Sequence, residues 1–216
     1  ERIQKELSCP VIQGYGLTES SPLTNADYAE PQLQKLGSIG PGAADTEQKI
    51  VDVEDPSIEM PYGETGELIV RGPQVMKGYY KNEEATAETI SQDFWLHTGD
   101  IGVMDDEGYV WILDRKKELI KYKGFQVPPA ELEGLLIEHP EVADAAVIGL
   151  PDLESGEIPK AFVVKSTGSK VTESELREYI AEKVATFKQI RAAEFVETIP
   201  KNPSGKILRR LLKDPV

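Results

Sequence analysis

The chain has 216 residues, of which 39% are hydrophobic and 29% are charged, a composition typical of a soluble globular protein with one or two domains. Its formal net charge of −14 argues against a nucleic-acid surface, and no apolar run is long enough to cross a bilayer. The single cysteine, Cys9, excludes an internal disulfide or a cysteine-based zinc cluster and indicates a reducing, cytoplasmic setting. The chain begins at Glu1 rather than at a methionine, so we expect that it was cut from a larger protein.

A glycine-rich loop near the start of the chain is the first candidate site. Residues 10–14 predict a short buried strand that leads into Tyr15-Gly16-Leu17-Thr18-Glu19. In such a loop the Thr18 hydroxyl can contact a phosphate oxygen, and the Glu19 carboxylate can bind hydrated Mg²⁺, which prefers hard oxygen ligands. On spacing alone, an ordinary glycine-rich turn with a threonine cap explains these residues better.

Residues 36–80 alternate short β-rich runs with turns rich in glycine and proline. Strands are predicted at residues 48–53, 67–71 and 75–80, and the close turns between them indicate a small antiparallel sheet or barrel. Residues 83–90 have the composition of a short helix, for which Asn82 is a suitable N-cap. This part of the chain is expected to serve mainly as scaffold.

The second candidate site follows that helix, in the segment Trp95-Leu96-His97-Thr98-Gly99-Asp100. An aspartate can accept hydrogen bonds from both vicinal hydroxyls of a ribose, although Asp100 would also suit the simple closing of a turn. His97, beside a tryptophan, is expected to be packed rather than to act as a base. Residues 105–108 predict a hairpin turn, and residues 109–113 the returning strand.

A basic cluster in the middle of the chain is the third candidate site. Five cationic side chains lie within nine residues of this acidic chain: Arg115, Lys116, Lys117, Lys121 and Lys123. Such a cluster indicates either a phosphate-bearing ligand or a solvated strand face, and composition does not decide between them.

The remaining residues alternate helices and strands, which predicts a compact α+β domain of about 100 residues. A helix is expected from Pro129, strands at residues 143–150, 160–165 and 194–198, and a second helix after the capping-box sequence Thr172-Glu173-Ser174-Glu175. The last candidate site is Lys206, on a loop rich in proline and glycine, where a lysine is more often a solvated surface charge.

Taken in order, these four segments resemble the motifs of the adenylate-forming enzymes. The wording of residues 117–127 is most similar to the branch that holds coumarate–CoA ligases, fatty acyl-CoA synthetases and firefly luciferases, so the chain is identified as the C-terminal portion of an AMP-forming acyl- or aryl-CoA ligase. The resemblance implies an α+β fold in which residues 1–114 end the large domain with a small antiparallel β-barrel-like subdomain. Residues 115–216 would form a mobile, compact α+β lid domain, with a hinge near residues 114–117.

The resemblance also implies roles for individual residues. Nucleotide contacts would come from five residues of three motifs: Tyr15, Gly16 and Thr18 of the first, Asp100 of the second and Arg115 of the third. Catalysis would use charge stabilisation by Lys206, Thr18 and Glu19, with Glu19 holding Mg²⁺. Asp114 and Lys117 would form the hinge, and CoA would be received by Lys121, Lys123 and Gly124.

The implied reaction uses ATP, which becomes AMP, together with Mg²⁺, CoA and a small fatty or aryl carboxylic acid. Three readings stay open: a carboxylate–CoA ligase, an adenylation unit that loads a carrier protein or emits light, and a non-catalytic module that retains the fold. The Ser/Thr/Gly-rich loop that handles the β- and γ-phosphates in this family is missing from the sequence. The 216-residue chain alone is therefore expected to be inactive.

Overall fold

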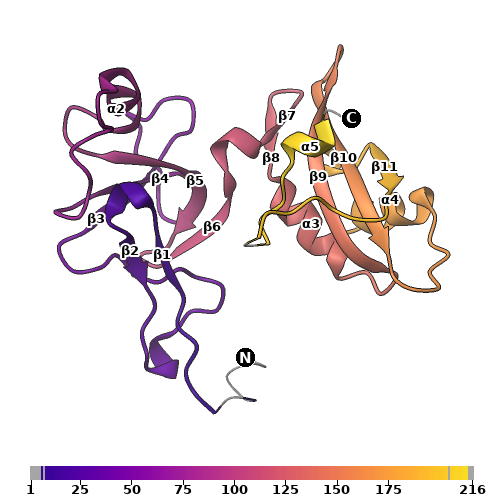
Figure 1. Cartoon of the computed structure of the whole chain (residues 1–216), viewed down its shortest axis with the longest axis horizontal. Coiled ribbons are helices and arrows are strands. Elements are labelled where there is room, and N and C mark those ends of the chain that lie inside the picture. The colour runs from indigo at the N-terminus through magenta and orange to yellow at the C-terminus, as the bar shows by residue number, and fades with distance from the viewer. Residues whose placement is uncertain (1–5, 7, 204, 214–216) are drawn as a thin grey trace. The chain divides into compact units, whose positions relative to one another are not determined.

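The computed structural model describes residues 6, 8–203 and 205–213, and the chain divides into two compact units, Glu1–Lys116 and Lys117–Val216, here called unit 1 and unit 2 (Figure 1). The boundary falls within the predicted hinge, but a movement about that point stays a prediction. Within the described ranges, no helix is long and apolar enough to cross a membrane. Helices and strands occur in both units, so the predicted α+β class is confirmed.

The main sheet of unit 1 is antiparallel and has four strands in sequential order: β3 (Glu47–Val51), β4 (Thr65–Arg71), β5 (Leu96–Met104) and β6 (Val110–Arg115). Its core consists of apolar side chains that are at most 2% exposed: Ile50, Leu68, Val70, Leu96 and Val110. The predicted strands at 48–53 and 67–71 correspond to β3 and β4, whose paired apolar residues keep the sheet in register.

The predicted barrel-like closure is wrong. In the described part of unit 1, β3 and β6 lie at opposite edges of the sheet, and each pairs with a single neighbouring strand. Closing a sheet into a barrel needs more strands than these four, with a stagger that lets the first strand meet the last. The alternation of strands and turns in the sequence indicated antiparallel pairing, but it carried no information on closure.

A two-stranded hairpin, β1 (Gly14–Gly16) and β2 (Leu23–Ala26), precedes this sheet and encloses the short 3₁₀ helix η1 (Thr18–Ser20). The predicted buried strand at residues 10–14 is wrong, because Val11 and Ile12 are 41% and 49% exposed and the strand begins only at its last residue. A second short helix, η2 (Pro31–Leu33), follows β2.

The strand predicted at residues 75–80 is also wrong, since this segment forms bends and a turn with one isolated bridge, between Tyr79 and Asn82. Gly78 has a φ of +150°, and the amide of Tyr79 donates to the Thr86 hydroxyl (2.9 Å) instead of pairing along a strand. The helix predicted next is confirmed as α2 (Glu83–Thr89), whose N-cap Asn82 accepts a hydrogen bond from the amide of Ala85 (3.1 Å).

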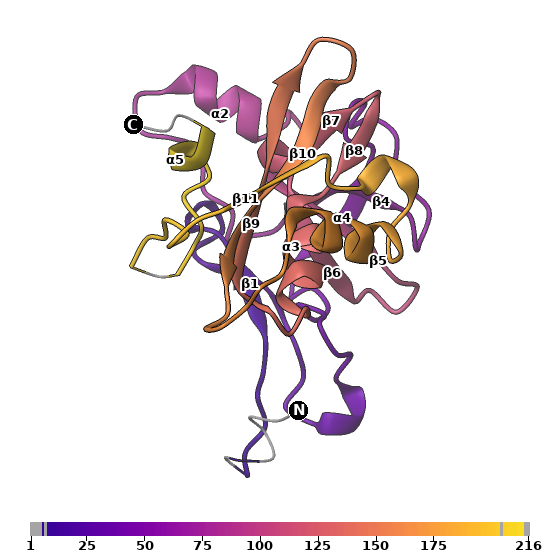
Figure 2. The same ribbon diagram turned by 90° about the vertical axis from the view of Figure 1, so that its right-hand side faces the viewer.

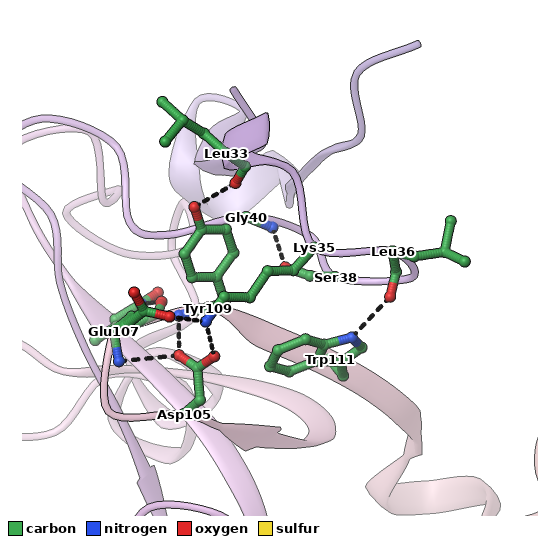
Figure 3. Close-up of polar contacts among 11 residues, drawn as sticks. Leu33, Lys35, Leu36, Ser38, Gly40, Asp105, Glu107, Tyr109 and Trp111 are labelled. Carbon is green, nitrogen blue, oxygen red and sulfur yellow. Dashed lines mark hydrogen bonds and ion pairs between the residues drawn. The ribbon is translucent and has the colours of Figure 1, made fainter. Parts of the chain in front are cut away.

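Lys35 lies in the loop that follows η2 and forms ion pairs with the turn between β5 and β6 (Figure 3). Its ammonium group lies 2.5 Å from Asp105 and also pairs with Glu107, while the hydroxyl of Tyr109 donates to the carbonyl of Leu33 (2.5 Å). The amide of Gly108 bonds the carbonyl of Asp105 (3.1 Å), as expected for the predicted hairpin turn, which is thereby confirmed. These acids therefore act as turn and anchor residues.

Unit 2 contains a five-stranded sheet built from β7 (Ile120–Tyr122), β8 (Phe125–Val127), β9 (Val142–Asp152), β10 (Gly156–Lys165) and β11 (Ala192–Phe195). A short 3₁₀ turn, η3 (Lys116–Glu118), leads into β7, and another, η4 (Thr186–Lys188), precedes β11, which runs parallel to β10. The strands predicted at 143–150 and 160–165 are confirmed as parts of β9 and β10. The strand predicted at 194–198 corresponds to β11, which begins two residues earlier and ends three residues earlier.

Helices α3 (Pro129–Ile137) and α4 (Glu173–Ala181) cover one face of this sheet (Figure 2). Leu132 and Leu176 pack there against inward-facing residues of β9 and β10. Both predicted helix starts are confirmed: Pro129 is the first residue of α3, and Thr172 forms a capping box with Glu175.

The opposite face of the same sheet is covered by the C-terminal segment. Ile199, Ile207 and Leu212 pack on a cluster of β9 and β10 side chains that includes Ile148 and Phe162. The segment ends in the short helix α5 (Arg210–Lys213). Burial of both faces explains why the central part of β9 is a continuous apolar run, since alternation is expected only where one face meets water.

Candidate active site

Tyr15, Asp100 and Arg115, which come from three separate motifs, meet in unit 1. Asp100 on β5 is paired in register with Arg115 on β6, and Arg115 Nε lies 2.6 Å from Asp100 Oδ1. The hydroxyl of Tyr15 on β1 donates a hydrogen bond to the other carboxylate oxygen, Oδ2. The Asp100 side chain is only 4% exposed, whereas that of Arg115 is 47% exposed. A ligand at this place would meet a buried acceptor beside an accessible guanidinium donor.

The protonation of Tyr15 follows from its surroundings. Burial raises the pKa of Tyr15, and the hydrogen bond to the Asp100 carboxylate raises it further. The phenol therefore stays protonated at neutral pH and remains a donor to Asp100. A second contact fixes the main chain of Asp100, because its amide donates to the Thr98 hydroxyl (3.0 Å).

Gly16, which the sequence placed at the nucleotide, has a packing reason to be glycine. A Cβ atom at this position would lie 1.6 Å from the carbonyl oxygen of Pro22, where β1 and β2 approach each other. A larger residue would push the two strands apart and displace Tyr15. Glycine here is thus required by the hairpin that carries Tyr15.

Thr18 and Glu19 lie on the turn that follows, in η1. Thr18 is exposed, and Glu19 Oε1 accepts a hydrogen bond from the hydroxyl of Tyr79 (2.8 Å), which raises the pKa of that tyrosine. In the described residues, no group of three or more His, Cys, Asp or Glu side chains could hold a metal ion. A single carboxylate suits Mg²⁺ that is shared with phosphates, because such ions keep several waters and use only one or two protein carboxylates.

Glu67 on β4 is a buried carboxylate that the motifs did not identify. Its Oε1 accepts from the amide of Gly99 (3.1 Å), the residue before Asp100, and its Oε2 lies 2.9 Å from Lys116 Nζ, the residue after Arg115. His97 Nδ1 lies 3.4 Å from the same oxygen. Glu67 therefore supports both strands of the Asp100–Arg115 pair. The available signal was a charged residue directly before the apolar run at residues 68–70.

The stability contribution of Glu67 is expected to depend on pH. Burial alone raises the pKa of Glu67, but hydrogen bonds from His97 and Lys116 outweigh it and hold that pKa below its usual value of 4.5. A carboxyl with a lowered folded-state pKa stabilises the fold above its unfolded-state pKa and loses that contribution as pH falls below it. We expect Glu67→Gln to cost about 1–3 kcal/mol at neutral pH, and less as pH falls below 4.5.

Urea unfolding followed by tryptophan fluorescence measures this effect, because both tryptophans of the chain, Trp95 and Trp111, belong to unit 1. Glu64→Gln is the control, since Glu64 is an exposed acid just before the same strand and its loss is expected to change little. A difference between wild type and Glu67→Gln that stays constant or grows at acid pH would contradict the role given to its charge.

Lys206 belongs to unit 2 and lies exposed on a tight turn. The amide of Lys206 donates to Asn202 Oδ1 (2.8 Å), and the amide of Asn202 donates back to the carbonyl of Lys206 (2.9 Å). Both of these hydrogen bonds use main-chain atoms of the lysine rather than its ammonium group. The side chain is accordingly placed on a formed loop and is accessible to an anion.

Lys121, Lys123 and Gly124 lie together on the β7–β8 hairpin of unit 2, all exposed. Lys123 and Gly124 are its two turn residues and have φ angles of +48° and +83°. Such turns favour glycine for its backbone freedom, and a Cβ at Gly124 would meet nothing within 4 Å. The glycine is thus explained by the turn itself, and its proposed service to an extended CoA arm stays a prediction.

The predicted hinge residues differ in their surroundings. Asp114 is buried on β6, and its Oδ1 accepts a hydrogen bond from the amide of Arg115 (2.7 Å). Lys117, the first residue of unit 2, is exposed. Asp114 therefore helps to order the end of β6, while Lys117 lies where the chain passes from one unit to the next.

Known protein families match both units. Residues 1–80 match the AMP-binding enzymes, and residues 131–206 match the AMP-binding enzyme C-terminal domain. The chain belongs to the AMP-binding enzymes. The first range contains Tyr15 to Glu19, and the second ends at Lys206. The predicted family is confirmed.

Individual relatives extend the match through Asp100 and the basic cluster. The chain is 52% identical to 4-coumarate–CoA ligase 1 of Solanum tuberosum over 204 residues, which is 93% of this chain but 37% of the relative. Among solved structures, it matches ATP-bound MatB from Rhodopseudomonas palustris with a TM-score of 0.87 and 32% identity, covering 94% of this chain and 40% of that one. It also matches o-succinylbenzoate CoA synthetase from Bacillus subtilis in complex with its acyl-adenylate intermediate, with a TM-score of 0.86 and 37% identity, covering 100% of this chain and 43% of that one.

Proposed function

We propose that the chain is the C-terminal part of an AMP-forming carboxylic acid–CoA ligase that acts on a fatty or aryl acid. The observation that carries the proposal is the meeting of Tyr15, Asp100 and Arg115, which gives a nucleotide a buried acceptor and an exposed cation in one place. The likeness to a 4-coumarate–CoA ligase over 93% of the chain supports CoA as the acceptor. The chain spans 37% of that relative, so the activity belongs to the full-length protein.

In the first half-reaction, a carboxylate oxygen of the substrate attacks the α-phosphorus of ATP, and the bond to pyrophosphate breaks. Asp100 and Arg115 bind the nucleotide, and the Thr18 hydroxyl donates to an α-phosphate oxygen. Glu19 would hold Mg²⁺, and the ion would supply neutralisation of phosphate charge. Lys206 stabilises the negative charge that develops between the carboxylate and the α-phosphate, an effect that commonly contributes a few kcal/mol.

In the second half-reaction, the CoA sulfur attacks the carbonyl carbon of the acyl-adenylate, and AMP leaves. Unit 2 turns about Lys117 between the two steps and presents the hairpin that carries Lys121, Lys123 and Gly124 to CoA. The ammonium groups of this hairpin suit the phosphates of CoA. Its glycine turn leaves room for the extended pantetheine arm.

Pyrophosphate exchange into ATP by the full-length protein, with fatty, aryl and amino acids in turn, tests the proposal. Exchange that depends on a fatty or aryl acid, followed by CoA thioester formation, is the expected result. Exchange without a thioester would favour a carrier protein as acceptor, and no exchange in a folded protein that binds ATP would favour a non-catalytic module. The 216-residue chain alone is expected to show none, and ATP-dependent thioester synthesis by it would contradict this. The cytoplasmic setting stays a prediction.

A further inference from the structure

The most enclosed ion-pair cluster of unit 2 surrounds Arg209. Its Nη2 lies 2.8 and 2.7 Å from the two carboxylate oxygens of Glu133, and its Nη1 pairs with Glu118. The side chains of Arg209, Glu133 and Glu118 are 14%, 9% and 25% exposed. Arg209 Nε also lies 3.3 Å from Glu133 Oε1, so two guanidinium nitrogens face the two carboxylate oxygens. Arginine and carboxylate thus meet as a two-pronged pair in a largely buried place, where such geometry is strongest.

The cluster also engages the main chain of β9. The carbonyl of Val147 accepts from Arg209 Nε (3.3 Å), and the amide of Val147 donates to Glu133 Oε1 (2.8 Å). Both polar main-chain groups of one strand residue are therefore bonded to the two members of the ion pair. This arrangement fixes Arg209 in position as well as in charge.

The positions of these residues in the chain suggest a use. Arg209 lies three residues after Lys206, and Glu118 lies directly after Lys117, the first residue of unit 2. Glu133 belongs to α3, which packs in the core of the unit. The cluster thus connects the segment that carries Lys206 to the beginning of unit 2 and to its central helix.

Stability alone does not explain such a cluster. A buried ion pair loses much of its Coulombic gain to desolvation, and apolar residues of similar volume often stabilise a fold equally well. The C-terminal segment is already held by apolar packing through Ile207 and Leu212. The ion pair contributes a fixed orientation, because a two-pronged pair holds the segment that carries Lys206 in one direction.

We propose that Arg209 is a positioning residue, which holds the segment carrying Lys206 to the first residues of unit 2 so that Lys206 turns with the unit as one rigid body. The proposal rests on the function proposed above. Its consequence is specific to the half-reaction that uses Lys206, because misplacing a catalytic group by about 1 Å costs on the order of 100-fold in rate.

The test is Arg209→Met in the full-length protein, a change that keeps length and removes the charge. Pyrophosphate exchange is expected to fall by on the order of 100-fold, while thioester formation from synthetic acyl-adenylate and CoA is unchanged. Lys188→Met is the matched control, since Lys188 pairs at 2.7 Å with Glu131, which lies on α3 like Glu133. This variant is expected to leave both half-reactions unchanged. In a Lys206→Ala background, Arg209→Met should cause no further loss of exchange.

An equal loss in both half-reactions, or no loss of exchange, would overturn the proposal. Hydrogen exchange gives a readout that does not depend on activity. The amides of Lys206 and Leu208, bonded to Asn202 and Pro200, should exchange faster in Arg209→Met, while those of α4 do not. Unchanged hydrogen exchange at these amides would also overturn the proposal about Arg209. A wild-type protein that shows no adenylation would instead refute the proposed function. If Arg209→Met does not fold, Glu118→Gln should cause a smaller loss in the same half-reaction, and no loss would count against the proposal.

Discussion

Replacing Lys206 by alanine in the full-length protein is expected to lower pyrophosphate exchange by about 100- to 1000-fold. The expectation follows from the role proposed for its ammonium group, which stabilises charge that is present only while the carboxylate attacks the α-phosphate. Thioester formation from pre-formed acyl-adenylate should continue at nearly the wild-type rate, because the bond between the carboxylate and the α-phosphate is already formed before CoA attacks. The two half-reactions are measured separately, by exchange and by release of AMP from acyl-adenylate.

The two hydrogen bonds described above between Lys206 and Asn202 do not use the lysine side chain. They join Asn202 to main-chain atoms of Lys206, and alanine keeps those atoms, so we expect Lys206→Ala to retain both bonds. Lys183→Ala is a matched control, since Lys183 is another lysine of unit 2 and faces Glu138 at 3.9 Å on the surface. Equal losses in both half-reactions for Lys206→Ala, or a loss for Lys183→Ala as large, would contradict the assigned role.

Local sequence signals predicted much of the fold because the physics behind them is local. Asn82 and Thr172 cap helices through hydrogen bonds to amides three residues ahead, so their effect is readable from a few neighbouring residues. The closure of the sheet in unit 1 was not predictable in this way. It depends on whether β3 and β6 pair, and these strands are separated by about 60 residues of chain.

The residues of the candidate site also differ in whether local sequence identifies them. Tyr15, Asp100 and Arg115 were found because each belongs to a recognisable motif, although nothing in the spacing of those motifs says that they meet. Glu67 and Arg209 were missed because their partners lie far away in sequence: Lys116 is 49 residues from Glu67, and Glu133 is 76 residues from Arg209. A charged residue beside an apolar run indicates that a partner exists, but only the fold identifies that partner.

Asp100→Asn in the full-length protein is expected to raise the KM for ATP by about 10- to 100-fold, with a smaller change in kcat. A ribose held by hydrogen bonds is bound equally well before and during the attack on the α-phosphate, so its loss weakens binding more than it slows chemistry. Asparagine keeps the shape of the side chain but replaces one acceptor oxygen by a donor and removes the charge that faces Arg115 at 2.6 Å. Initial-rate kinetics at varied ATP, with direct titration of AMP, measure both effects.

Asp105→Asn is the matched control for this variant. Asp105 lies in unit 1 directly after β5 and pairs with Lys35 at 2.5 Å, but it belongs to the anchored turn rather than to the nucleotide motif (Figure 3). The asparagine oxygen can still accept from the amides of Glu107 and Tyr109, so the turn is retained. We expect the KM for ATP to rise in Asp100→Asn and to stay near the wild-type value in Asp105→Asn. If both variants raised the KM for ATP equally, the effect would arise from loosening of the sheet. That result would contradict the assignment of Asp100 to the nucleotide site.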